Sequence, residues 1–146
     1  MPPFTLPFTA GPDHIDVMGH VNNAVWVQWM ETMATAHWEA VAAPAHQAAY
    51  AWVVTRHEID YRGNIGLGES VTAETFIPDG PTGARFDRRV DFRNAAGKVI
   101  VSARTTWAMV DRASGRLMRV PAEVAAPFLD QAGAVRASTS ATDTTG

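Results

Sequence analysis

The residues best suited to chemistry lie in one short stretch near the N-terminus. Residues 13–23 read Asp-His-Ile-Asp-Val-Met-Gly-His-Val-Asn-Asn and stand directly before the longest helical pattern of the chain. Gly19 permits backbone conformations that are closed to other residues, and Asn22 or Asn23 can accept the free N–H groups of a first helical turn. The sequence therefore predicts a loop that ends where a helix begins, near Asn23.

Asp16 lies just upstream of this predicted helix start. A helix N-terminus presents unpaired N–H groups and about half a positive charge, so it favours an oxyanion placed against it. Hydrolysis of an activated acyl group requires a group that attacks or activates water, together with donors aimed at the charge that develops. The sequence contains no cysteine, which excludes a thiol nucleophile and a sulfur-ligated metal. Activity must therefore come from oxygen and imidazole groups.

This stretch resembles a known family signature. Residues 16–26, followed by Glu31, are similar to the pattern Asp-x-x-Gly-His-x-Asn-Asn-x-x-Tyr-x-x-x-x-Glu of hotdog-fold acyl-CoA thioesterases of the 4-hydroxybenzoyl-CoA thioesterase type. The pattern of the remaining chain, to about residue 130, is compatible with that family. Two positions depart from it. Trp26 stands where the family has tyrosine, which removes any hydroxyl role there, and His14 replaces the first acid of an Asp-x-Asp that often precedes the glycine.

The resemblance implies roles for individual residues. In that family the aspartate three positions before the glycine is the catalytic carboxylate, which implies this role for Asp16, either as nucleophile or as general base. The backbone N–H at the start of the following helix polarises the thioester carbonyl, which implies this role for Asn23. The motif positions further imply catalytic parts for His20 and Glu31, and substrate contacts by Gly19, Val21, Asn22 and Trp26.

Each of these residues also has a structural explanation. An aspartate near a helix N-terminus is common for electrostatic reasons alone, and Asn22 and Asn23 are ordinary capping residues. His20 is either an imidazole bonded to a carbonyl, the role we favour, or a proton carrier. Glu31 lies on the polar face of the predicted helix, where it is either a solvated or paired carboxylate or a group that aligns water or the partner subunit.

The predicted function is that of an acyl-CoA thioesterase, which hydrolyses its substrate to free acid and CoA. Two alternatives stay open: a hotdog enoyl-CoA hydratase or dehydratase that relies on His20 and an acid, and a non-catalytic acyl-CoA binding or assembly module. No Gly-x-Ser-x-Gly elbow supports a serine hydrolase. No metal and no cofactor is expected, although four side chains of the stretch would suit a divalent ion, namely Asp13, His14, Asp16 and His20.

The predicted elements form a scaffold for this stretch. From Asn23 to Val41 apolar residues recur at helical spacing, with polar residues on the opposite side, and Pro44 limits the helix. The tryptophans on the apolar face of this helix must be buried against another element, and a curved sheet is large enough to cover them. Alternating apolar and polar residues between turn residues predict strands over residues 4–9, 51–61, 69–77, 84–93 and 98–110, a last short strand over 117–120, and a short helix opened by Pro121.

Two details of these strands concern the site. The alternation in 51–61 assigns Val53, Thr55, Ile59 and Tyr61 to one face. Arg88 falls in phase with the apolar residues of 84–93, which makes it a member of an interface ion pair or marks an irregularity of the strand. Arg88 is also one of several basic residues that could contact a CoA phosphate, and the sequence does not show which of them does. These residues are Arg56, Arg62, Arg85, Arg88 and Lys98.

One long helix followed by hairpin-linked strands gives an α+β fold, an antiparallel sheet wrapped around one long central helix, as in the hotdog family. The 146 residues fit one domain over 1–130, with 131–146 as a flexible tail. A net charge of −3 and no basic run give no reason to expect nucleic acid. No segment is apolar enough for stable membrane insertion, so a cytoplasmic location is the default. The resemblance implies a homodimer or homotetramer with the active site between subunits.

Overall fold

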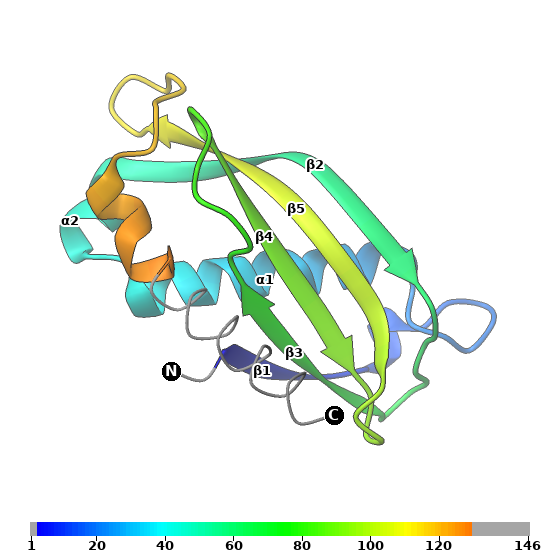
Figure 1. Ribbon diagram of the computed structural model, residues 1–146. Coiled ribbons are helices and arrows are strands. Elements are labelled where there is room, and N and C mark those ends of the chain that lie inside the picture. The colour runs from blue at the N-terminus through cyan, green and yellow to red at the C-terminus, as the bar shows by residue number, and fades with distance from the viewer. Residues whose placement is uncertain (1–2, 130–146) are drawn as a thin grey trace, which may run out of the picture.

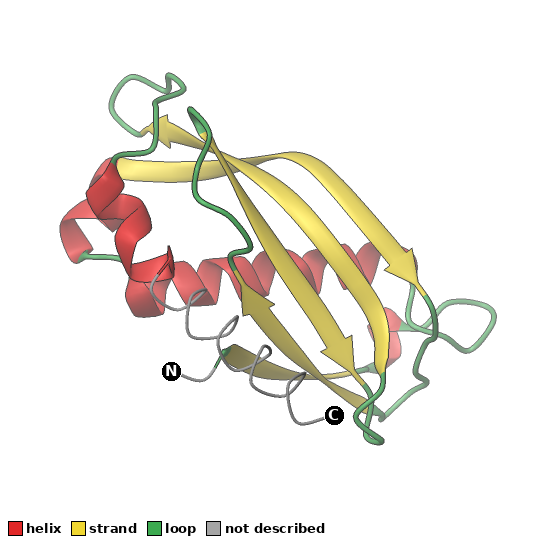
Figure 2. Ribbon diagram, viewed as in Figure 1, coloured by secondary structure: helices red, strands yellow, loops and turns green. Residues whose placement is uncertain are grey.

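The computed structural model describes residues 3–129 of the chain. One antiparallel sheet wraps around one long helix, α1, as Figures 1 and 2 show. The strand order in the sheet is β1-β3-β4-β5-β2, so β1 and β2 form its two edges. The elements are β1 (Phe4–Thr9), α1 (Asn23–Val41), α2 (Pro44–Ala49), β2 (Tyr50–Tyr61), β3 (Ser70–Phe76), β4 (Arg85–Arg93) and β5 (Val99–Asp111), with a 3-10 turn at Pro12–His14 and a further helix over 122–129.

Helix α1 begins and ends for local reasons. The side chain of Asn22 accepts a hydrogen bond from the backbone N–H of Ala24 and so caps the first turn. At the other end the N–H of Ala42 donates to Trp38, and Pro44 cannot continue the helix but opens α2 instead. The predicted helix from Asn23 to Val41 is confirmed.

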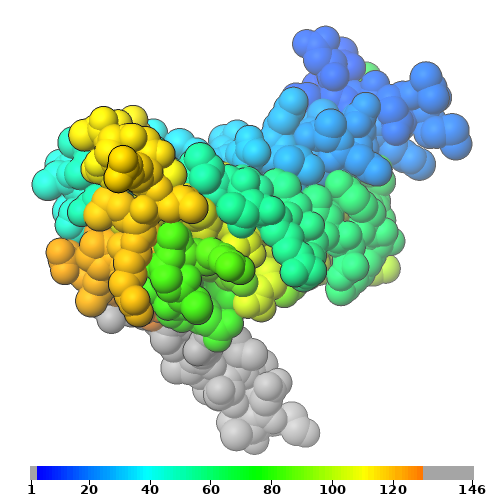
Figure 3. Space-filling model, turned by 90° about the horizontal axis from the view of Figure 1, so that it is seen from above, coloured from blue at the N-terminus to red at the C-terminus, as the bar shows by residue number. Residues whose placement is uncertain are grey.

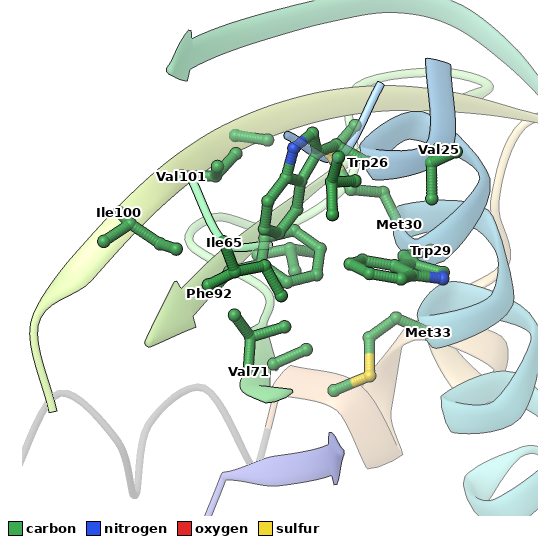
Figure 4. Packing of buried hydrophobic residues seen from close by; sticks show 14 of the residues in the cluster. Val25, Trp26, Trp29, Met30, Met33, Ile65, Val71, Phe92, Ile100 and Val101 are labelled. Atoms are coloured by element: carbon green, nitrogen blue, oxygen red, sulfur yellow. The ribbon is translucent and has the colours of Figure 1, made fainter. Parts of the chain in front are cut away.

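The half of α1 that follows its N-terminus packs into the first core cluster (Figure 4). Trp26 is fully buried, and its ring meets Phe92 of β4 edge-on, with centroids 5.0 Å apart. Trp29 stacks on Phe8 of β1 at 5.2 Å. Burying a large apolar side chain contributes about 2 kcal/mol, so these contacts hold the helix against β1 and β4. The cluster also contains Val21, Val25, Met30, Met33, Ile65, Val71, Ala73, Val90, Ile100, Val101 and Ala103.

A second core cluster surrounds the C-terminal end of α1, and the helix over 122–129 closes it. Its members come from five parts of the chain: Ala42, Ile77, Phe86, Met109, and the C-terminal group Val120, Val124, Ala125 and Phe128. Between α1 and the sheet, a row of polar side chains, one from α1 and four from the strands, separates the two clusters. This polar row consists of His37, His57, Thr75, Arg88 and Thr105.

One strand departs from its predicted phase. The register of β2 against β5 shifts between Val54 and Arg56, so one additional residue stands in β2 there. A bulge of this kind exchanges the two faces of a strand. Val53 and Thr55 are therefore exposed, whereas the sequence pattern placed them on the same face as Ile59, which is half-buried. The prediction of one continuous alternation through 51–61 is wrong.

The other predicted strands and helices agree with the structure in most respects. The five main strands are confirmed to within a residue of their predicted ends. Helix α2 lies in the connector that the sequence left without structure. The predicted strand over 117–120 reduces to a single bridge between Leu117 and Val110, while a short helix follows Pro121 as expected. The tail predicted over 131–146 lies outside the described residues. The α+β class is confirmed.

Candidate active site

The stretch before α1 folds into a small hairpin. Ile15 and Val21 pair across it, and the N–H of Asp16 donates to His20 at 2.8 Å. Gly19 closes the turn with a φ of +78° and donates its N–H to the carbonyl of Asp16. The hairpin lies at the end of α1 where the helix begins and projects from one corner of the molecule (blue in Figure 3). The sequence thus builds a rigid loop beside the helix N-terminus.

The carboxylate of Asp16 is held by its own loop. Its Oδ1 accepts the N–H of Met18 at 2.9 Å and the N–H of His20 at 3.1 Å. No residue within the described range 3–129 donates a hydrogen bond to its Oδ2. The side chain is half-buried. One carboxylate oxygen therefore fixes the direction of the group, and the other stays available to a substrate or a water molecule.

The first turn of α1 leaves one donor unused. Asn22 caps Ala24 through its side chain, and its backbone carbonyl accepts the N–H of Val25. The N–H of Asn23, the first residue of the helix, has no acceptor among the residues that the structure describes. An unpaired N–H at a helix N-terminus adds to the positive end of the helix dipole. This donor is suited to a carbonyl oxygen that gains negative charge.

Two residues that the sequence analysis did not select support this end of the helix. Asn64 clamps the hairpin, because its Oδ1 accepts the N–H of Val21 and its Nδ2 donates to the carbonyl of Val21, both at 3.1 Å. The hydroxyl of Tyr61 donates to the carbonyl of Asn23 at 3.3 Å, and burial raises the pKa of Tyr61. Both contacts join segments about forty positions apart, so no local pattern could reveal them.

The other residues selected from the sequence do not all gather here. His20 lies in the hairpin with an exposed side chain. Glu31 is exposed on the outer side of α1, eight residues beyond Asn23 and thus about 12 Å along the axis. Val21 and Trp26 are both fully buried in the first core cluster. A substrate contact by either remains a prediction, and packing accounts for their positions.

A cavity beside α1 lies away from this hairpin. It has a volume of about 290 Å³ and is lined by the C-terminal half of α1, starting at Ala34, and by β2, β4, β5 and the helix over 122–129. Ala34 is eleven residues beyond Asn23, so the cavity begins about 16 Å along α1 from the helix start. Within one chain, Asp16 and this cavity are therefore at opposite ends of the helix.

The described residues offer neither a metal site nor a membrane-spanning helix. Nowhere between residues 3 and 129 do three or more His, Asp or Glu side chains come close enough to hold a metal ion. A short loop contains Asp13, His14, Asp16 and His20, but Nδ1 of His14 is already engaged, because it accepts the N–H of Gly11 at 2.9 Å. Over the same range, none of the helices has both the length and the apolar character needed to cross a membrane.

A sheet wrapped around one long helix, with an acid-bearing hairpin ahead of that helix, is the arrangement of the hotdog class. Comparison with sequence families agrees. The chain belongs to the thioesterase-like superfamily, whose sequence model matches residues 10–128. Among curated proteins, none matches this chain in sequence.

Solved structures share the fold at low sequence identity. A hypothetical protein of Staphylococcus aureus in complex with CoA superposes with a TM-score of 0.80 at 13% identity, over 90% of this chain and 84% of that one. The probable thioesterase YbaW of Escherichia coli gives 0.72 at 21% identity, over 87% and 96%. An acyl-ACP thioesterase of Bacteroides thetaiotaomicron gives 0.74 at 22% identity over 86% of this chain, which spans 52% of that longer one.

The conformation of Gly19 gives a first prediction. A side chain at a φ of +78° is strained even though no atom lies within 4 Å of the added Cβ position. We expect Gly19→Ala to lower the free energy of unfolding by about 1 kcal/mol and to slow any hydrolysis, because the turn orients Asp16. Gly11→Ala is the matched control, since Gly11 has a φ of −92° and only ordinary contacts. Equal effects of the two substitutions in thermal melts and activity assays would contradict this account.

Proposed function

We propose that the protein is an acyl-CoA thioesterase that hydrolyses its substrate to a free acid and CoA. One observation carries this proposal: two groups suited to the reaction lie at the same end of α1. They are the carboxylate of Asp16, with one oxygen held and one available, and the backbone N–H of Asn23, which has no acceptor among residues 3–129. Membership of the thioesterase-like superfamily supports it. The complex of the Staphylococcus aureus protein with CoA supports CoA as the carrier of the acyl group.

In the proposed reaction the thioester carbonyl oxygen accepts the N–H of Asn23. The carbonyl carbon is attacked either by Asp16 or by a water molecule that Asp16 deprotonates, and the negative charge then develops on the oxygen beside the helix start. Collapse of that intermediate breaks the C–S bond and releases CoA as the thiolate. If water attacks, the free acid is formed directly and the proton that Asp16 took from water passes to the thiolate. If Asp16 attacks, the acyl group remains on it as a mixed anhydride, which a water molecule then hydrolyses to the free acid and the regenerated carboxylate, and the proton released from water passes to the thiolate. The Asx-type bonds from Met18 and His20 keep Asp16 oriented throughout.

The acyl group needs a pocket. The distance between the start of α1 and the cavity of the same chain indicates that this pocket is the cavity of a second protomer. The cavity begins about 16 Å from the helix start, too far for a short acyl group whose carbonyl lies at Asn23. Strand β2 is an edge of the sheet, and its last residue, Tyr61, contacts the start of α1, whereas its first residues, Ala51 and Trp52, line the cavity. Antiparallel pairing of β2 with β2 of a second copy would therefore bring the helix start of one protomer to the cavity of the other.

The free edge of β2 is suited to such pairing. The N–H of Arg62 donates to Ile100 of β5, and N–H directions alternate along a strand. The N–H groups of Tyr61, Ile59 and His57 must then point away from β5, towards the open edge. A long edge strand with unpaired N–H groups is a template for another strand. The proposal thus includes a homodimer in which each active site combines Asp16 of one protomer with the cavity of its partner.

Apolar side chains at the hairpin tip fit this arrangement. Val17 and Met18 are 102% and 74% exposed, and Leu67 in the neighbouring loop is 62% exposed. Exposed apolar groups that gather in one place mark surfaces that another molecule covers. In the proposed dimer Val17 and Met18 would approach the partner together with the start of α1, which they precede, and Leu67 would lie beside them.

The direct test is release of CoA from a panel of aromatic, short-chain and long-chain acyl-CoA substrates, measured with a thiol reagent. We expect release from at least one class well above the uncatalysed rate. Consumption of an enoyl-CoA double bond without CoA release would instead identify a hydratase. Saturable binding of acyl-CoA with neither reaction would identify a binding module. Either result would overturn the proposed hydrolysis.

A further inference from the structure

The middle of the polar row holds a buried positive charge. Arg88 of β4 is 7% exposed and lies between Phe86 of the second core cluster and Val90 of the first. The register of β4 is regular at Arg88, so the interpretation as a strand irregularity is wrong. Within residues 3–129 no carboxylate forms an ion pair with Arg88, and an ion pair across a subunit interface stays a prediction. Burial lowers the pKa of Arg88 to about 10. A buried charge without a counter-ion is costly, so its retention calls for an explanation.

Half of the guanidinium is already paired. Its Nη1 donates to Nδ1 of His37 at 2.7 Å and to the hydroxyl of Thr75 at 2.8 Å. Because arginine only donates, Nδ1 of His37 must be the acceptor in this contact. The threonine hydroxyl in turn donates to the carbonyl of Arg89 at 2.9 Å. These contacts fix the plane of the guanidinium group of Arg88.

The other edge of the guanidinium has no acceptor. Neither Nε nor Nη2 of Arg88 forms a hydrogen bond with any residue in the described part of the chain. These two nitrogens present parallel N–H groups, the geometry that binds both oxygens of one carboxylate. Arg88 lines the cavity described above. The unpaired edge therefore belongs to a side chain that a bound molecule can reach.

Two tryptophans of the cavity wall also carry a buried polar group. Trp52 and Trp107 both line the cavity, and the indole N–H of each is buried with no hydrogen-bond partner within residues 3–129. Buried donors in native proteins are nearly always paired. The rest of the wall is largely apolar, including Trp38, Phe86 and Phe128. The cavity thus combines a largely apolar wall with one buried cation, Arg88.

The size of the cavity limits what it can hold. A cavity of about 150 Å³ accommodates benzene, and the present one measures about 290 Å³. It can hold an aromatic ring with one substituent or a short aliphatic chain. The one carboxylate on the cavity wall, Glu39, is exposed at its rim and forms no ion pair with Arg88.

We propose that Arg88 makes the protein selective for acyl groups that carry a second carboxylate at the end remote from the thioester. The second carboxylate binds the Nε and Nη2 edge of Arg88, and the apolar part of the acyl group fills the cavity. This inference rests on the proposed thioesterase function and on the cavity of one protomer facing the helix start of its partner. It names the substrate class: CoA monothioesters of short dicarboxylic acids.

The test compares matched substrates of equal length. Succinyl-, glutaryl-, adipoyl- and suberoyl-CoA are measured against butyryl-, pentanoyl-, hexanoyl- and octanoyl-CoA. For at least one length we expect kcat/KM to favour the carboxylate form by about tenfold or more. Hexanoyl-CoA with a terminal hydroxyl, a neutral acceptor, should fall well below adipoyl-CoA. Equal rates for charged and uncharged chains at every length, or for the hydroxyl and carboxylate forms, would overturn the proposal.

Substitutions distinguish a specific role of Arg88 from the general effect of removing one positive charge. We expect Arg88→Met to reduce kcat/KM for the preferred carboxylate substrate by about 100-fold, while the uncharged chain of the same length changes by less than about threefold. Arg116→Met is the control, because Arg116 is exposed and does not line the cavity. If Arg88→Met fails to fold, Arg88→Lys is the second variant. Lysine keeps the charge but lacks the two parallel N–H groups of the guanidinium, so the preference for the carboxylate substrate should be intermediate. A variant that keeps the full wild-type preference would overturn the assignment to Arg88.

A binding measurement does not depend on hydrolysis. Free adipate should raise the melting temperature of the wild-type protein more than hexanoate does, and Arg88→Met should remove the difference. If no acyl-CoA is hydrolysed but this difference is present, the proposed function fails and the carboxylate site stands. If acyl-CoA is hydrolysed without a preference for carboxylate and adipate has no added effect, the carboxylate site fails alone.

Discussion

Asp16→Asn should lower kcat for every acyl-CoA that the wild-type protein hydrolyses by about 10³-fold, the middle of the range for loss of a general base. Asparagine keeps an Oδ1 that can accept the N–H groups of Met18 and His20, so the hairpin retains its shape. What is lost is the ability to attack the thioester or to deprotonate water. The measurement is CoA release under saturating substrate.

Asp13→Asn provides the control for charge in this loop. Asp13 is exposed and lies in the 3-10 turn just before the hairpin, so its substitution alters the local charge equally but should change kcat by less than about twofold. Melting temperatures of both variants should stay close to the wild-type value. Near-normal hydrolysis by Asp16→Asn, with an intact fold, would show that Asp16 is not the catalytic carboxylate.

Two inactive variants should restore activity when they form a dimer together. Asp16→Asn removes the carboxylate but leaves the cavity, and Ala34→Phe fills the cavity, whose wall includes the buried side chain of Ala34, but leaves the carboxylate. If each site combines Asp16 of one protomer with the cavity of the other, a mixed dimer contains one intact site and one site with both defects. Such a dimer should show about half of the wild-type rate, as expected for a two-fold symmetric assembly.

The mixed dimer can be isolated after co-expression with two different affinity tags, and its rate compared with those of the two parent dimers. Sedimentation or light scattering should give twice the mass of one chain for all three. An active parent variant would show that its substitution misses the site. A mixed dimer as inactive as its parents would show that Asp16 and the cavity act within one chain, and a monomeric wild-type protein would exclude the shared site.

The sequence alone determined the local structure. Period and capping residues placed α1 at Asn23–Val41, and alternation between turn residues placed the five strands nearly to their ends. The same local information indicated a loop at Gly19 and a helix start after Asn22. These features follow from contacts between residues a few positions apart, where periodicity, glycine conformation and capping act directly.

Only the tertiary structure decided which side chains meet across the sheet. The bulge in β2 exchanged the faces of Val53 and Val54, because register depends on pairing with β5 and not on local alternation. Arg88 reaches His37 and Thr75 because three separate elements bring them together. Its free edge, the cavity beside it and the distance of both from Asp16 follow from these long-range pairings, which no stretch of neighbouring residues encodes.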